Sequence, residues 1–115
     1  MVIGNGFDSS KRIRNSKDFV NAFRNKAISN SWFTINFVQN TYNMSRLGMV
    51  ISKRTIPNSV TRNYAKRIIR EVFRQHYSKY PTIDFVVRIR RTVSTSNFIE
   101  VREALLDLLN KASLK

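Results

Sequence analysis

Residues 59–80, SVTRNYAKRIIREVFRQHYSKY, carry the strongest pattern in this sequence and decide its fold. On a helical wheel of about 100° per residue, the stretch separates into two faces. Basic residues recur at every fourth position along one face: Arg62, Lys66, Arg70 and Arg74. The opposite face is apolar: Ala65, Ile68, Ile69, Val72 and Phe73. The pattern predicts an amphipathic helix that runs from about Ser59 to about Tyr80, before Pro81, and packs its apolar face on a core.

Shorter elements are predicted on both sides of this helix. They are a helix from about 17 to 25, strands at 32–39, 46–53 and 84–89, and a final helix from about 97 to 111. The first two strands are close in sequence and separated by a turn, so we expect them to pair as an antiparallel hairpin. The predicted order is α-β-β-α-β-α, an α+β chain without internal repeats.

Length and composition fit one small folded domain with a very positive surface. The chain has 115 residues and a formal net charge of +14, and 42% of its residues are hydrophobic. Without cysteine it can form neither disulfides nor cysteine-ligated metal sites. The longest apolar stretch, 47–51, is far shorter than the ~20 residues of a membrane helix. A polyanionic partner would relieve the self-repulsion of the charge.

The ends of the chain differ from its middle in composition. Residues 1–10 are rich in Gly, Asn and Ser, and we expect a flexible N-terminus there. We expect a single domain over 11–112 and a short tail over 113–115. The N-terminal residues include no long apolar segment typical of a secretory signal, so we expect a cytoplasmic protein and no membrane partner.

The basic face of the long helix has two interpretations. Charge runs are most often solvated helix faces, but such faces normally mix signs, and between Lys53 and Arg74 there is one acid, Glu71. Like charges at i, i+4 oppose helix formation. We therefore favour a phosphate-binding face, because Arg guanidinium groups match phosphate oxygens and binding releases counterions.

Other residues are ambiguous from the sequence alone. Phe19 and Phe23 fit core packing on their spacing, and the alternative is a surface on which unpaired bases stack. Trp32 and His76 favour packed positions. Two interpretations fit Arg88, Arg90 and Arg91: they are solubilising residues at a sheet edge, or they contact a polyanion. The seven carboxylates show no spacing typical of metal ligands.

The segment 62–74, RNYAKRIIREVFR, resembles the Arg-Asn-x-x-Lys-Arg-x-x-Arg-Glu-x-Phe-Arg signature of the bacterial ribonuclease P protein subunit. Three other segments resemble family motifs: KRIRNSKDFVNAF at 11–23, RLGMVISKR at 46–54, and the Asp-aromatic-Val-Val strand at 84–91. The resemblance covers about residues 11–112. Tyr64 stands where the family commonly has Arg, on the side of the helix away from the basic face.

The resemblance implies a fold, an activity and partners. The fold would be an α/β sandwich of one small mixed sheet and three helices, with a left-handed crossover containing the signature, as also seen in a ribosomal protein domain. The activity would be endonucleolytic removal of the 5′ leader from precursor tRNA. The catalytic centre would belong to the RNA subunit with bound Mg²⁺, so no catalytic or metal-binding residue and no small-molecule substrate is expected for this chain.

The resemblance also assigns residues to two surfaces. The catalytic RNA subunit would bind the signature face, which comprises Arg62, Asn63, Lys66, Arg67 and Arg70. The single-stranded leader would lie in a cleft lined by Phe19, Phe23, Ser52, Lys53, Arg54, Arg90 and Arg91. For the two phenylalanines, this turns the balance from core packing to base stacking.

Two alternatives stand beside this prediction. A ribosomal or other structural RNA-binding protein would share the fold and the charge, because fold alone does not decide function. A protein-only nuclease would need a cluster of metal-binding carboxylates, and the few acids of this chain are scattered along it.

Overall fold

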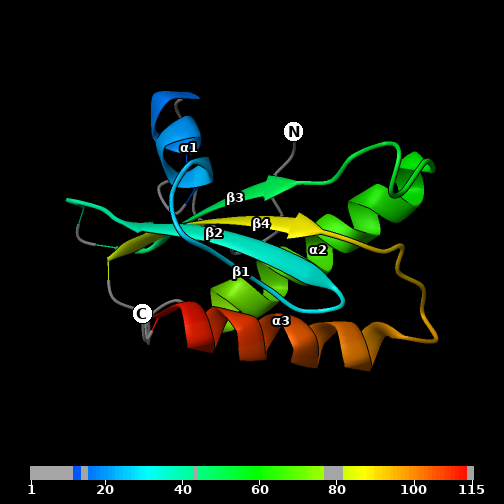
Figure 1. Cartoon of the computed structure of the whole chain (residues 1–115). Helices are drawn as coiled ribbons and strands as arrows, with labels where there is room; N and C mark the ends of the chain where they lie inside the picture. The colour runs from blue at the N-terminus through cyan, green and yellow to red at the C-terminus, as the bar shows by residue number, and fades with distance from the viewer. Residues whose placement is uncertain (1–11, 14–15, 43, 77–81, 114–115) are drawn as a thin grey trace.

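The computed structural model describes residues 12–13, 16–42, 44–76 and 82–113. Within them three helices and four strands follow one another (Figure 1). The elements are α1 (Ser16–Phe23), β1 (Ala27–Ser29), β2 (Phe33–Gln39), β3 (Arg46–Val50), α2 (Ser59–His76), β4 (Ile83–Ile89) and α3 (Phe98–Ser113). The fold is α+β, as predicted.

The four strands form one mixed sheet in the order β1-β2-β4-β3. β4 pairs antiparallel with β2, where Phe37 lies opposite Phe85, and parallel with β3, where Leu47 lies opposite Phe85. The antiparallel hairpin predicted for 32–39 and 46–53, which correspond to β2 and β3, is therefore wrong, because β4 lies between them. The physical reason is the composition of β4: Phe85, Val86 and Val87 are fully buried, and a strand that is apolar on both faces belongs inside a sheet.

The other predicted elements are present with shifts of a few residues at their ends. α2 begins at Ser59 because the side chain of Asn58 accepts hydrogen bonds from the amides of Val60 and Thr61. The predicted end of this helix, 77–80, lies outside the described residues, as do 1–11 and 114–115. The sequence analysis missed β1, which has three residues and pairs antiparallel with β2.

The helices lie on opposite faces of the sheet (Figure 1). α2 and α3 cover one face together, and α1 lies across the other face, where it contacts β2 and β4. α2 connects β3 to its parallel neighbour β4, so the signature lies in the crossover between two adjacent strands. Each helix in the described part of the chain is too short or too polar to cross a lipid bilayer.

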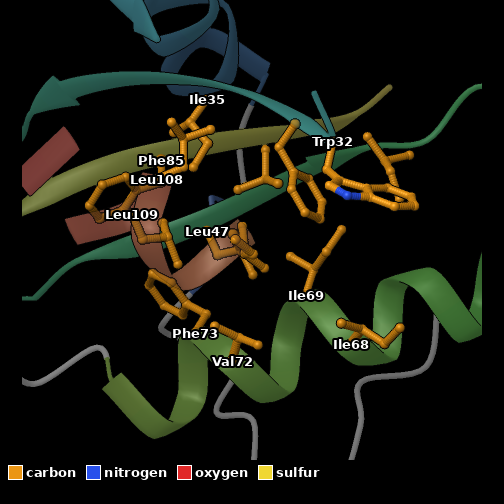
Figure 2. Close-up of a cluster of buried hydrophobic side chains, with 14 of the residues drawn as sticks. Trp32, Ile35, Leu47, Ile68, Ile69, Val72, Phe73, Phe85, Leu108 and Leu109 are labelled. Atoms are coloured by element: carbon orange, nitrogen blue, oxygen red, sulfur yellow. The ribbon is translucent and has the colours of Figure 1, made fainter. Parts of the chain in front are cut away.

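The hydrophobic core fills the space between the sheet and the pair α2 and α3 (Figure 2). All five residues predicted for the apolar face of α2 are buried: Ala65, Ile68, Ile69, Val72 and Phe73. The ring of Phe73 meets that of Phe85 edge to face, with 6.1 Å between ring centroids. Trp32 is also buried, as expected, and Tyr64 packs against the core from its margin. The basic side of α2 is thereby turned outward.

Candidate nucleic-acid interface

The signature face of α2 lies on the surface of the molecule, but its five members differ in their surroundings. Asn63 and Arg67 are exposed, whereas Arg62, Lys66 and Arg70 are half-buried. Burial lowers the pKa of the Arg70 guanidinium, and the positive charges of Arg12 and Arg67 lower it further. A bound anion would relieve this repulsion, so the face is electrostatically suited to phosphate.

Two arginines of the same helix also make contacts within the protein. Nη1 of Arg62 donates hydrogen bonds to the carbonyls of Ile56 (2.9 Å) and Pro57 (2.8 Å), and so holds the loop before α2. Nη2 of Arg74 forms an ion pair with Glu71 at 2.6 Å. Arg74 therefore adds less net charge to the basic side of α2 than the sequence pattern suggests.

The two phenylalanines of α1 form a partly exposed aromatic pair. The rings of Phe19 and Phe23 stack with 6.4 Å between centroids and 15° between planes, and 40% of Phe23 is exposed. The residue of α1 that is buried is Ala22. The prediction from spacing alone, that both rings fill the core, is therefore wrong for Phe23, and α1 uses a small residue to approach the sheet.

Arg88 joins this pair and was not among the predicted leader-binding residues. Its guanidinium lies over the ring of Phe23, 4.8 Å from the centroid, and its Nη2 lies 3.5 Å from Oδ1 of Asn36. β4 is an inner strand, so the interpretation of Arg88 as a residue at a sheet edge is wrong. The alternation of side chains along β4 could have placed Arg88 on the sheet face opposite the core.

A cavity of about 450 Å³ lies between Phe19 of the aromatic pair and Lys66 of the signature face. It is lined by Arg12, Ile13, Phe19, Leu47, Gly48, Met49 and Lys66. Phe19 comes from α1 and Lys66 from α2, so the two surfaces that the sequence treated as distinct meet at β3. The lining combines an aromatic wall with cationic groups, which suits a nucleotide better than an apolar ligand.

Four of the cations predicted to bind the leader follow the carboxyl ends of two strands. Lys53 and Arg54 follow β3, and Arg90 and Arg91 follow β4. Because β3 and β4 are parallel and adjacent, these four residues lie beyond the carboxyl ends of both strands, and all four are exposed. We call them the carboxyl-end cluster. The predicted contact Ser52 is exposed too, but its hydroxyl donates to Oγ1 of Thr55 (2.9 Å) and stabilises the turn.

Trp32 packs against Arg91, one residue of the carboxyl-end cluster. The guanidinium of Arg91 lies 4.0 Å from the centroid of the Trp32 ring. The indole Nε1 of Trp32 donates a hydrogen bond of 2.9 Å to Glu100 at the start of α3. Trp32 is thus a core residue, as expected, with an additional role in holding Arg91.

Most acidic side chains in the described part of the chain have partners within the protein. Five of the six described carboxylates accept hydrogen bonds or form ion pairs: Asp18 and Asp84 with Arg46, Glu71 with Arg74, Glu100 with Trp32, and Asp107 with Lys111. Among the described residues, no three acidic or histidine side chains come together as a metal site. The side chain of His76 lies outside the description.

Known proteins resemble this chain in sequence. The family model of Ribonuclease P matches residues 7–113. The ribonuclease P protein component of Thermotoga maritima is 36% identical over 111 residues, which are 91% of this chain and 94% of the relative. That of Saccharophagus degradans is 38% identical over 98 residues, or 84% of this chain and 73% of the relative.

Solved structures resemble it in fold. The RNase P protein of Staphylococcus aureus aligns with a TM-score of 0.78 at 28% identity, and covers 89% of this chain and 94% of that one. The RNase P protein of Thermotoga maritima aligns with a TM-score of 0.73 at 33% identity, over 87% and 96% of the two chains. The chain therefore belongs to the family of ribonuclease P protein components, the subunits that act with an RNA subunit in the maturation of tRNA 5′ ends.

Proposed function

We propose that this chain binds precursor tRNA directly, by holding its single-stranded 5′ leader on the aromatic pair while the signature face binds the catalytic RNA subunit. The observation that carries the proposal is the partly exposed, stacked pair Phe19 and Phe23, with Arg88 over the second ring. Exposed aromatic rings beside cations bind unpaired bases with little dependence on sequence.

The electrostatics support a division of labour between protein and RNA. The signature face and the carboxyl-end cluster provide cations for two RNA chains that would otherwise repel each other. The Mg²⁺ ions of the reaction are assigned by this proposal to the RNA subunit. This assignment is supported by Asp18 and Asp84, whose carboxylates both form ion pairs with Arg46. The proposed location is the cytoplasm, in keeping with a chain without cysteine.

The test is cleavage of precursor tRNA by the cognate catalytic RNA at low Mg²⁺, with and without this chain. We expect the chain to increase cleavage, because its cations replace part of the screening that Mg²⁺ provides at higher concentration. The increase should be larger for a precursor with a leader of several nucleotides than for one with a single leader nucleotide. Equal rates with and without the chain would refute the proposal.

Substitution Phe23→Ala tests the leader site itself. Loss of one stacked base costs about 1–3 kcal/mol, so precursor affinity should fall by about 5- to 150-fold. Affinity for mature tRNA, which has no leader, should stay the same. Val20→Ala is the matched control, because Val20 is an apolar residue of the same helix with similar exposure (44%). Equal losses for precursor and mature tRNA would return Phe23 to a structural role.

A further inference from the structure

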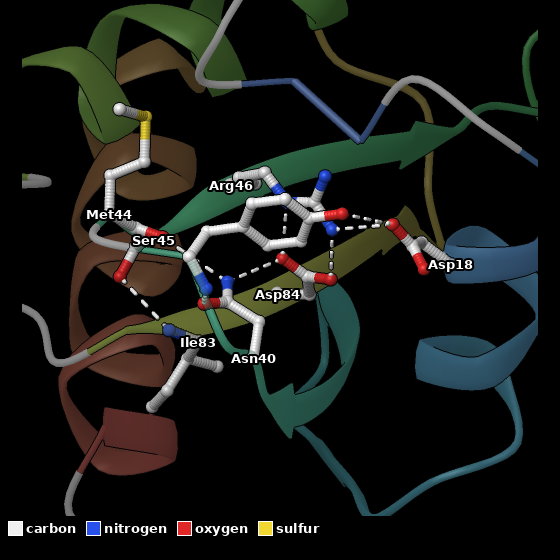
Figure 3. Close-up of polar contacts among 8 residues, drawn as sticks. Asp18, Asn40, Met44, Ser45, Arg46, Ile83 and Asp84 are labelled. Carbon is white, nitrogen blue, oxygen red and sulfur yellow. Dashed lines mark hydrogen bonds and ion pairs between the residues drawn. The ribbon is translucent and has the colours of Figure 1, made fainter.

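A buried arginine lies under the N-terminal end of α1. Arg46 of β3 donates two hydrogen bonds to Asp84 of β4, from Nε to Oδ1 at 2.8 Å and from Nη2 to Oδ2 at 2.7 Å (Figure 3). Both side chains are almost fully buried, with 7% and 4% of their surface exposed. The pair is bidentate, the arrangement that best fixes the orientation of a guanidinium group.

The same guanidinium also binds α1. Its Nη2 donates to Oδ2 of Asp18 at 2.9 Å, and Asp18 is in the first turn of α1. Tyr42 completes the group: its ring centroid lies 3.9 Å from the Arg46 guanidinium, and its hydroxyl donates to Asp18 at 3.3 Å. The hydrogen bond with Asp84, followed by that with Asp18, raises the pKa of Arg46 although burial lowers it.

α1 depends on such contacts for its position. It has eight residues, too few for a stable helix in isolation, and of these only Ala22 is buried. At its C-terminal end, Nδ2 of Asn36 donates to the carbonyl of Phe23 at 2.9 Å. Near its N-terminal end, Asp18 accepts a hydrogen bond from Arg46 of β3.

Phe19 is the residue next to this contact. Its ring lies directly on β3, where a Cβ added to Gly48 would come within 2.9 Å of Phe19 Cε2. A shift of the first turn of α1 would move this ring away from β3 and from the cavity that it lines with Lys66. Asp18 is thus bound to Arg46 one residue before the ring that lines this cavity.

We propose that Asp18 is a positioning residue for leader binding, which acts by fixing the first turn of α1 to Arg46 and thereby holding Phe19 at the cavity on β3. The inference rests on the proposed function of the aromatic pair and adds a residue outside the predicted site. Asp18 carries the wrong charge to bind RNA, so its contribution to affinity has to pass through the residues that it positions.

This sign makes the proposal testable with Asp18→Ala in the assembled holoenzyme. Removal of an acid raises the net charge, so a purely electrostatic effect would strengthen RNA binding. The positioning role predicts the opposite: the gain in affinity due to the leader falls by about fivefold or more, the lower bound for one stacked base. Asp107→Ala, which removes an acid from an exposed ion pair on α3, should change it by less than about twofold.

A double variant tests whether Asp18 acts through Phe19. Asp18→Ala should have no further effect on leader-dependent affinity in a chain that already carries Phe19→Ala. Additive losses would overturn the proposal, as would an unchanged or increased affinity in the single variant. An equal loss of affinity for the RNA subunit would also overturn it, because that outcome indicates general damage to the fold.

Amide hydrogen exchange separates this inference from the proposed function. In the free protein, amides of α1 should exchange faster in Asp18→Ala than in Asp107→Ala, whatever the helix binds. If the leader gives the wild-type holoenzyme no gain in affinity for precursor tRNA, the proposed function is refuted. The hydrogen-exchange result would then still decide whether Asp18 positions α1. Unchanged exchange in α1 would refute the positioning role itself.

Discussion

Gly48 of β3 leaves the space that the ring of Phe19 occupies. Gly48 belongs to the segment 46–54, which resembles a family motif, and the structure gives a physical reason for a glycine at this position. The ring of Phe19 occupies the space of the missing side chain, and Ile13 closes it from the other direction. Any other residue would meet the Phe19 ring at a distance shorter than van der Waals contact.

Gly48→Ala should therefore displace Phe19 while the fold persists. The added methyl group would lie 2.9 Å from Cε2 of Phe19, but this ring is half-buried and can turn away. We expect the free energy of unfolding to fall by about 1 kcal/mol, the lower range for an overpacked site, as measured by urea denaturation. The affinity for precursor tRNA should fall as well. An unchanged affinity would show that leader binding does not require Phe19 to contact β3 at Gly48.

Arg67→Ala tests the signature face at the residue scale. Arg67 is exposed on α2, so its removal should weaken binding of the RNA subunit without affecting the core. If Arg67 contacts a phosphate, the salt dependence of log K should become shallower by about one unit. The measurement is a titration at several salt concentrations, with Lys111→Ala on α3 as the control for loss of one exposed cation. An unchanged slope for Arg67→Ala would contradict the contact.

At the scale of elements, the sequence predicted what is local and missed what is not. The helical wheel identified α2 and its buried face because the side chains repeat within one element. The antiparallel hairpin was wrong because the pairing of β2 depends on β4, which follows about 45 residues later in the chain. β1 was missed because Ala27–Ser29 is too short to show alternation.

The candidate site follows the same rule. The spacing of Phe19 and Phe23 showed that they share one side of α1, but not whether this side faces the core or the solvent. Arg88 belongs to the site through a contact with Phe23 that links two distant segments. Arg62 was predicted as an RNA contact from its place in the signature, and its hydrogen bonds to the preceding loop emerge from the fold. The sequence could identify the residue types, while tertiary structure decides their surroundings.

The inner position of β4 predicts its hydrogen exchange. Its backbone is paired on both sides, and Phe85, Val86 and Val87 have no exposed surface. We expect successive amides of β4 to exchange only when the whole protein unfolds, whereas β1, which is paired on one side, exchanges by local opening. An alternating pattern of fast and slow amides along β4 would instead indicate an edge strand, as the hairpin arrangement would require.

At the scale of the whole molecule, the charge of +14 is distributed in a way that composition alone did not show. Half of the described acids form ion pairs with arginines: Asp18 and Asp84 with Arg46, and Glu71 with Arg74. Arg12, Arg67 and Arg70 lie near one another: burial lowers the pKa of Arg70, and the positive charges of Arg12 and Arg67 lower it further. We therefore expect repulsion among these cations to destabilise the free protein.

This repulsion predicts that salt stabilises the free chain. A rise in NaCl from 0.01 to 0.1 M shortens the Debye length from about 30 to about 10 Å, which screens separated surface charges and leaves the buried pair of Arg46 and Asp84 largely unaffected. We expect the Tm to rise by about 4 °C, corresponding to roughly 1 kcal/mol. Single-stranded RNA should raise the Tm at low salt, and this effect should vanish at high salt as binding weakens. A Tm that falls with salt would mean that ion pairs outweigh repulsion, and that the clustered cations of α2 cost the free protein no stability.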